Sequence, residues 1–166
     1  MNVQELRDMF PILSSKVYGK SLVYFDNAAT SQRPASVVNK WTEMTVQSNA
    51  NIHRGVHRLA EVATDEYETT RDAVASFINA GSREEIIFTS GTTASVNLVA
   101  FSFGEASVKE GDEIVVTEAE HHSNIVPWQM MCERKGAALK VLHVDDTGHL
   151  KLHELDGLLT PRTKIV

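Results

Sequence analysis

The chain has 166 residues, 42% of them apolar and 23% charged, and a formal net charge of −6. This composition is typical of a folded globular domain, and the acidic balance argues against nucleic acid or an anionic membrane surface as a partner. The first ten residues lack the apolar core of a secretory signal and no later window could span a membrane, so we expect a cytoplasmic protein.

The first half of the chain is predicted to be mainly helical. Apolar spacing indicates a short helix at 2–10, a brief strand at 21–26, and helices at 35–48 and 58–79. The segment from Asn79 to Gly81 has the residue types that end a helix.

The second half alternates between strands and helices. The predicted strands are 85–89, 112–118, 138–144 and 163–166, and the predicted helices are 92–103, 125–136 and 151–159. This order predicts an α/β fold, with a mostly parallel sheet and helices on both faces. Ligands of such sheets bind beyond the carboxyl ends of the strands. Since the last strand ends with the chain, we expect a truncated fold.

A glycine and two threonines lie where the first of these strands meets the following helix. Unpaired N–H groups and the positive end of the helix dipole attract anions there, Gly91 lets the backbone approach closely, and Thr92 and Thr93 add hydroxyl donors. This pattern indicates a phosphate site. The alternative is that a threonine only caps the helix. The lysine of a P-loop is missing.

Two adjacent histidines, His121 and His122, follow the next predicted strand. With Glu118 and Glu120 they could bind a metal, but neighbours in an extended loop point apart and zinc motifs have other spacings, so we expect no metal. An imidazole that stacks against a flat cofactor is the sharper hypothesis. A solvated loop is the alternative.

Three further features allow a functional and a structural interpretation. The segment 51–58 contains His53 and Arg54, which could meet a carboxylate or another subunit, or could form a solvated loop. Ala28 and Ala29 follow a predicted strand and leave room for a ligand, beside a turn. Cys132 lies on a predicted helix, and we expect an ordinary half-buried cysteine rather than a reactive thiol.

Taken together and in this order, several stretches resemble the amino-terminal part of a known family. These are YFDNAATSQRP, NIHRGVH, EIIFTSGTTASVNLVA, EHHSNIVPWQ and the closing TPRTKIV. They are similar to the pyridoxal-phosphate-dependent cysteine desulfurases of the second group and to selenocysteine lyases, which are class V aminotransferase relatives. The resemblance implies the first part of the large domain of a fold-type I enzyme at 21–166, after a helical segment at 1–20.

The resemblance also implies roles for single residues. The cofactor would be pyridoxal phosphate, its phosphate held at the glycine and threonine junction and its ring stacked on a catalytic histidine. Small and basic residues of the first half would bind substrate near a dimer interface. In chain order, these residues are Ala28, Ala29, His53, Arg54, Gly91, Thr92, Thr93 and His121.

The activity that the resemblance implies is the removal of sulfur from L-cysteine. The sulfur would leave as an enzyme persulfide and give L-alanine, in a homodimer that serves a sulfur-acceptor protein and iron–sulfur cluster assembly. The family's cofactor-binding lysine, ring-nitrogen aspartate, nucleophilic cysteine and substrate arginine lie in segments absent from these residues, so we expect this chain alone to be inactive.

Two alternatives and one departure remain. One alternative is a selenocysteine lyase, acting on L-selenocysteine, or another class V lyase. The other is a short non-catalytic protein that binds the cofactor or another phosphate, or pairs with a subunit. The departure is Ala94, where the family commonly has glutamate.

Overall fold

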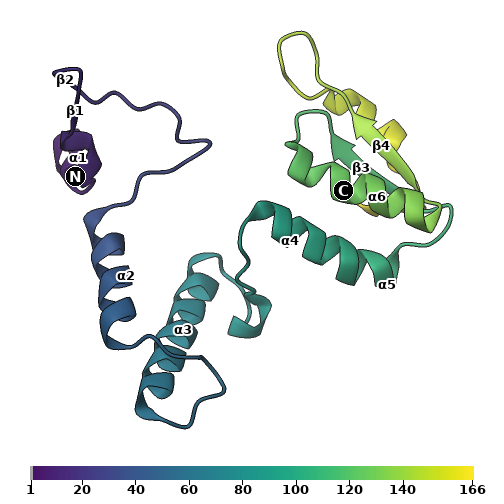
Figure 1. The fold of residues 1–166 in the computed structure, drawn as a ribbon. Coiled ribbons are helices and arrows are strands. Elements are labelled where there is room, and N and C mark those ends of the chain that lie inside the picture. The colour runs from purple at the N-terminus through teal and green to yellow at the C-terminus, as the bar shows by residue number, and fades with distance from the viewer. Residues whose placement is uncertain (1) are drawn as a thin grey trace. The chain divides into compact units, whose positions relative to one another are not determined.

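The computed structural model describes residues 2–166. The chain divides into two compact units, Met1–Ile86 and Ile87–Val166. Figure 1 shows the order of the elements along the chain. The sequence did not predict a boundary at Ile86. The expected separation of a helical segment at 1–20 from 21–166 stays a prediction.

The first unit is built around helices. Its elements are α1 (Val3–Asp8), a 3-10 turn η1 (Pro11–Ser14), β1 (Lys16–Val17), β2 (Lys20–Ser21), α2 (Ala35–Gln47), α3 (Arg58–Phe77) and a 3-10 turn η2 (Arg83–Glu85). The three predicted helices are confirmed. α3 ends as predicted: Asn79 adopts a positive φ of 58° and the Ala80 N–H donates to the Ala75 carbonyl at 2.9 Å.

The strand predicted at 21–26 is wrong beyond its first residue. β1 and β2 form a two-stranded antiparallel hairpin in which Lys16 pairs with Ser21. One more bond follows, from the Leu22 N–H to the Ser15 carbonyl at 3.0 Å, and the partner strand then gives way to η1. Because a strand needs a hydrogen-bonded neighbour, residues 22–26 run as irregular chain despite their apolar sequence.

The second unit is an α/β layer structure. Its elements are α4 (Thr92–Val99), a π-helical turn η3 (Ala100–Gly104), α5 (Glu105–Ser107), β3 (Glu113–Thr117), a 3-10 turn η4 (His122–Asn124), α6 (Val126–Lys135), β4 (Ala138–Leu142), a 3-10 turn η5 (Leu152–Glu154), α7 (Leu155–Leu158) and β5 (Thr163–Ile165).

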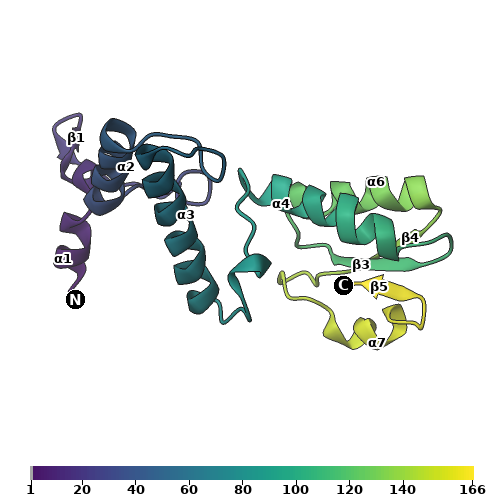
Figure 2. The ribbon, with the colours of Figure 1, turned by 90° about the horizontal axis from the view of Figure 1, so that it is seen from below.

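The sheet of this unit is parallel, in the order β4-β3-β5, with Glu113 to Thr117 of β3 paired in register with Ala138 to Leu142 of β4. In Figure 2, α4 and α6 lie on one face of the sheet and α7 on the other. The expected α/β fold, with helices on both faces of a parallel sheet, is confirmed. The core forms where the apolar faces of α6 and β3 meet, and includes Ala100, Val108, Ile114, Val116, Trp128, Met131 and Cys132.

The strand predicted at 85–89 does not form. After η2 the chain continues without strand structure to Thr89, and Ile87 is 68% exposed. No segment among residues 2–166 pairs with it, so the sheet of the second unit has three strands instead of the expected four. Apolar sequence alone is insufficient because pairing supplies the hydrogen bonds of a strand.

Cys132 is buried in the core of the second unit, and this burial raises the pKa of its thiol. A raised pKa reduces the thiolate fraction that would react. The expectation of an ordinary structural cysteine is confirmed, although the side chain is more deeply buried than expected.

Glu113, at the amino end of β3, is a carboxylate with only 3% of its surface exposed. Lys140 Nζ lies 2.8 Å from Oε2, the Thr160 hydroxyl donates to Oε2 at 2.6 Å, and Arg162 Nη2 donates to Oε1 at 3.2 Å. The hydrogen bonds from Lys140 and Thr160 lower the pKa of Glu113 to about 2. The hydroxyl of Thr163, the first residue of β5, also donates to Oε2, at 3.3 Å, so one ionised group joins all three strands of the sheet.

We expect this carboxylate to make the second unit sensitive to acid. Since the folded pKa lies below the ordinary 4.5, its stabilisation is complete above about pH 4.5 and disappears as the pH falls toward about 2. Glu113→Gln should therefore lower the urea midpoint at about pH 6, and the difference from the parent should shrink at about pH 3. Glu133→Gln, at an exposed position of α6, is the control. A Glu113→Gln deficit that does not change with pH would contradict the prediction.

Candidate functional site

The amino end of α4 is the first part of the candidate site. Gly91 is the N-cap residue, with φ 150° and ψ 178°, a conformation that is essentially restricted to glycine. Thr92 and Thr93 are the first helical residues, and no side chain caps the helix. The alternative that a threonine caps this helix is therefore wrong, and the N–H groups of the first turn are left for a ligand.

The carbonyl of Gly91 is held in place from the helix side. The Ser95 N–H donates to it at 3.0 Å, and the hydroxyls of Thr89 and Ser95 lie within hydrogen-bonding distance of the same oxygen, at 3.2 and 3.3 Å. These two hydroxyls also lie 2.6 Å from each other. The backbone is fixed on one side, while a Cβ built on Gly91 would meet nothing within 4 Å, so the other side is open to a ligand.

A pocket of about 390 Å³ brings this helix start together with the loop after β3. Its lining residues are Ser90, Gly91, Thr92, Thr93, Ala94, His121 and Ser123. The structure therefore places the four residues assigned to the cofactor at one site. The start of α4 and the loop after β3 therefore meet at one pocket, although the strand expected before α4 does not form.

His121 is held in a defined orientation in this pocket. Its Nδ1 accepts the Ser123 N–H at 3.1 Å and lies 3.0 Å from the Ser123 hydroxyl. An Nδ1 that accepts a backbone N–H carries no hydrogen, so the neutral ring has its hydrogen on Nε2. The neighbouring His122 ring is nearly perpendicular, at 85°, with its centroid 6.1 Å away.

The residues considered as metal ligands have other partners. Glu118 accepts the Val144 N–H at 2.9 Å and lies 3.2 Å from His143 Nδ1, and Glu120 accepts hydrogen bonds from Thr117 and Asn124. In the part of the chain that the structure describes, no group of three or more histidine, cysteine, aspartate or glutamate residues could hold a metal ion.

The residues assigned to substrate binding lie in the first unit. Ala28 and Ala29 are exposed in a turn, where the N–H groups of Ala29 and Thr30 donate to the Asp26 carbonyl at 3.2 and 3.0 Å. The Tyr24 hydroxyl donates to the Thr30 carbonyl at 2.8 Å and fixes the other end of the turn.

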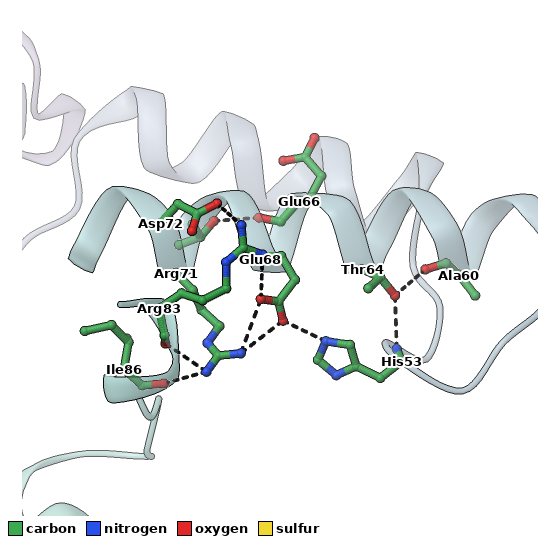
Figure 3. A network of polar contacts seen from close by, with 10 residues as sticks. His53, Ala60, Thr64, Glu66, Glu68, Arg71, Asp72, Arg83 and Ile86 are labelled. Atoms are coloured by element: carbon green, nitrogen blue, oxygen red, sulfur yellow. Dashed lines mark hydrogen bonds and ion pairs between the residues drawn. The ribbon is translucent and has the colours of Figure 1, made fainter. Parts of the chain in front are cut away.

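His53 contacts α3 while 47% of its side chain stays exposed, so the loop is anchored to the helix and the solvated-loop interpretation stays open. His53 adopts a positive φ of 62°, its N–H donates to Thr64 Oγ1 at 3.0 Å, and its Nε2 lies 2.8 Å from Glu68 Oε1. Figure 3 shows both contacts. The edge of the ring also meets Tyr67, with the centroids 5.5 Å apart. Arg54 is exposed beside it.

Glu68 is the centre of a polar network that the sequence did not reveal (Figure 3). Arg71 and Arg83 each donate to it at 3.2 Å, and Arg71 also donates to the carbonyls of Arg83 and Ile86. Burial alone would raise the pKa of Glu68, but hydrogen bonds from His53 and Arg71 outweigh it and the pKa is lowered. The ionised carboxylate therefore ties the His53 loop to the segment after α3. The spacing of Glu68 and Arg71 was the only signal in the sequence.

The second unit combines a parallel sheet, a helix start without a side-chain cap and an imidazole in the same pocket, which places the chain in the α/β class of parallel-sheet proteins. The particular family follows from comparison. The model of the aminotransferase class-V family matches residues 23–166, and the chain belongs to that family.

Curated relatives are named as probable cysteine desulfurases. One, from Staphylococcus aureus (strain COL), is 53% identical over 165 residues, which are 99% of this chain and 40% of the relative. Another, from Mycolicibacterium paratuberculosis, is 51% identical, with 99% of this chain and 24% of the relative covered. The chain thus spans less than half the length of these relatives.

Solved structures give the same result. The apo cysteine desulfurase of Thermococcus onnurineus NA1 matches with a TM-score of 0.87 and 39% identity, over 99% of this chain and 40% of that one. A cysteine desulfurase of Escherichia coli, in an S-sulfonic acid form, matches with a TM-score of 0.82 and 35% identity over the same shares. The resemblance inferred from the motifs is confirmed at the level of family and fold.

Proposed function

We propose that this chain supplies the phosphate-binding and ring-stacking part of a pyridoxal-phosphate-dependent cysteine desulfurase. The observation that carries the proposal is the pocket that joins Gly91, Thr92 and Thr93 to His121 in a chain of the class-V aminotransferase family. Its donors are N–H and hydroxyl groups, which suit a phosphate, and its imidazole suits a flat aromatic ring.

The residues of the chain would bind the cofactor in two ways. The N–H groups of the first turn of α4 and the hydroxyls of Thr92 and Thr93 would donate to the phosphate, assisted by the helix dipole. The neutral ring of His121 would lie on the pyridine ring and keep an Nε2–H donor available. When bound, the cofactor withdraws electrons from the substrate carbon that carries the amine.

The rest of the proposed activity extends beyond these residues. The substrate would be L-cysteine, its sulfur leaving as a persulfide on an enzyme cysteine and giving L-alanine. Ala28, Ala29, His53 and Arg54 would line the substrate side near a homodimer interface. A sulfur-acceptor protein and iron–sulfur cluster assembly in the cytoplasm complete the proposal. Within residues 2–166, no helix combines the length and apolar character needed to cross a bilayer.

Turnover would require the family's lysine, aspartate, cysteine and arginine segments, and we propose that the 166-residue chain alone binds without reacting. Cys132 does not replace the persulfide cysteine, because it is buried and its thiol pKa is raised. A selenocysteine lyase, or a non-catalytic binding or subunit-pairing protein, would use the same pocket. The mass of the intact protein, isolated from its native source, tests whether it is a short non-catalytic protein of this kind.

We expect the 166-residue chain to bind pyridoxal phosphate saturably and to release no alanine from L-cysteine. Thr92→Ala removes one donor to the phosphate, and His121→Ala removes the stacking ring. Each should weaken binding by about five- to tenfold, which corresponds to about 1–1.4 kcal/mol per interaction. Absorbance titration with the cofactor measures the affinity.

Matched controls are available in the same chain. Thr42→Ala removes an exposed threonine hydroxyl from α2, and His153→Ala removes an exposed imidazole in η5. Both should leave the affinity unchanged. Equal affinities of the parent chain, Thr92→Ala and His121→Ala would contradict the assigned roles, and alanine release by this chain would contradict its proposed inactivity.

A further inference from the structure

The loop that carries His121 is held by a second set of contacts, which does not touch the cofactor pocket. We infer that Glu120 is a positioning residue: its carboxylate fixes the loop between β3 and α6, so that the His121 ring keeps one orientation and one tautomer toward the cofactor. This inference rests on the proposed function for its meaning, since it concerns the same pocket. The contacts from which it is argued lie within this chain and do not depend on a bound cofactor.

The carboxylate of Glu120 bridges the two ends of the loop. The hydroxyl of Thr117, the last residue of β3, donates to Oε1 at 2.9 Å. The amide nitrogen of Asn124, the last residue of η4, donates to Oε2 at 2.9 Å. Both oxygens therefore accept a hydrogen bond, Oε1 from a residue before His121 in the chain and Oε2 from a residue after it. The bridge closes residues 117–124 into a ring that contains the histidine.

The orientation of the Asn124 side chain is fixed by its two neighbours. Trp128 Nε1, which can only donate, lies 2.9 Å from Asn124 Oδ1. An ionised Glu120 can only accept, so it must face the amide nitrogen. Trp128 is itself buried in the core of the second unit. The chain of contacts therefore runs from a rigid core residue through Asn124 and Glu120 to the end of a central strand.

These residues lie away from the cofactor pocket. Glu120, Asn124 and Trp128 line a separate pocket of about 210 Å³, together with apolar residues of β3, β4 and α7. The pocket of about 390 Å³ is lined instead by His121 and Ser123 from the same loop. The loop thus separates the two pockets. Glu120 lines only the pocket of about 210 Å³, and it can act on a ligand in the pocket of about 390 Å³ through the position of His121.

The charge state of Glu120 fits this role. Hydrogen bonds from Asn124, and then from Thr117, lower the pKa of its carboxyl group. It remains an acceptor for both donors at neutral pH. Glutamine could make the same two contacts with its amide turned, since Oε1 would accept from Asn124 and Nε2 would donate to the Thr117 hydroxyl. We therefore expect the loop to require a side chain that bridges Thr117 and Asn124, and not the negative charge of Glu120.

The test compares Glu120→Ala with Glu120→Gln in the 166-residue chain. We expect Glu120→Ala to weaken pyridoxal phosphate binding about tenfold, which corresponds to the loss of about one hydrogen bond to a charged group. The affinity of Glu120→Gln should stay within about twofold of the affinity of the parent chain. In the chain without cofactor, nitrogen NMR of labelled histidine should show a single Nε2–H tautomer for His121 in the parent and in Glu120→Gln. A mixture of tautomers is expected in Glu120→Ala.

Two further variants keep the test decisive. Thr117→Val removes one anchor with little change in shape and should give part of the Glu120→Ala effect, even if Glu120→Ala itself does not fold. Glu118→Ala removes a carboxylate two residues away that binds His143 and Val144 instead, and should leave His121 unchanged.

The inference and the proposed function fail in different ways. If Glu120→Ala and Thr117→Val keep the parent tautomer pattern, or if Glu120→Gln behaves like Glu120→Ala, Glu120 does not position His121 as inferred. If the parent chain binds no pyridoxal phosphate, the proposed function fails for this chain, while the tautomer measurement still decides the role of Glu120.

Discussion

Gly55→Ala is expected to destabilise the first unit by about 2–3 kcal/mol, as overpacking of a close contact does. Gly55 lies in the loop that carries His53, directly before α3. A Cβ built there would lie 2.2 Å from the Cβ of Ala60, which is 0% exposed, and 3.3 Å from His57 Nε2. Neither methyl group can rotate away, so the loop or the first turn of α3 must move.

The movement should also loosen the residues that depend on this loop. The His53 contacts to Thr64 and Glu68 require the loop to lie against α3. Hydrogen exchange of the α3 amides, measured with and without the substitution, reports both effects in the first unit. The matched control is Gly157→Ala in α7, where a Cβ would meet nothing within 4 Å and should be neutral or slightly stabilising. Equal exchange rates in the parent and Gly55→Ala would refute the contact.

Elements with local signals were predictable from the sequence. The helices α2, α3 and α6 follow apolar periodicity and have recognisable ends, such as the positive φ at Asn79. β3 is a short apolar run that becomes the central strand of its sheet. In each case the residues that define the element lie within a few positions of one another.

Elements that depend on distant partners were not predictable in the same way. Residues 85–89 have the sequence of a strand, but a strand also needs a neighbour, and none of residues 2–166 pairs with them. The same holds for 22–26, whose pairing ends where η1 begins. Since the relatives are at least twice as long as this chain, an apolar run here need not find its partner within these residues.

The same distinction between local signals and distant partners applies to the candidate site. Gly91, Thr92 and Thr93 were found because a strand–helix junction carries its chemistry in adjacent residues, and the His121 hypothesis came from the neighbouring junction. The Glu120 bridge joins Thr117 to Asn124, and the Glu68 network joins α3 to His53 and Arg83. Such contacts depend on where the side chains meet after folding, and no spacing in the sequence specifies them.

Gly91→Ala is expected to weaken the binding of pyridoxal phosphate by about five- to 150-fold, which corresponds to the cost of about 1–3 kcal/mol for a strained backbone. Gly91 adopts φ 150°, which a residue with a Cβ rarely tolerates, and yet nothing lies within 4 Å of the added methyl group. The effect would therefore come from the backbone rather than from a clash. Relaxation of this strain would turn the first N–H groups of α4 away from the phosphate position.

The control for Gly91→Ala must carry the same kind of strain elsewhere. Gly111 also has a positive φ, of 80°, with nothing within 4 Å of a built Cβ, and it precedes the amino end of β3, whereas His121 follows the carboxyl end. Gly111→Ala should lower the unfolding midpoint of the second unit as Gly91→Ala does, but leave the cofactor affinity unchanged. If both variants lose affinity in proportion to stability, the conformation of Gly91 has no specific role in binding, whereas loss in Gly91→Ala alone makes its backbone part of the phosphate site.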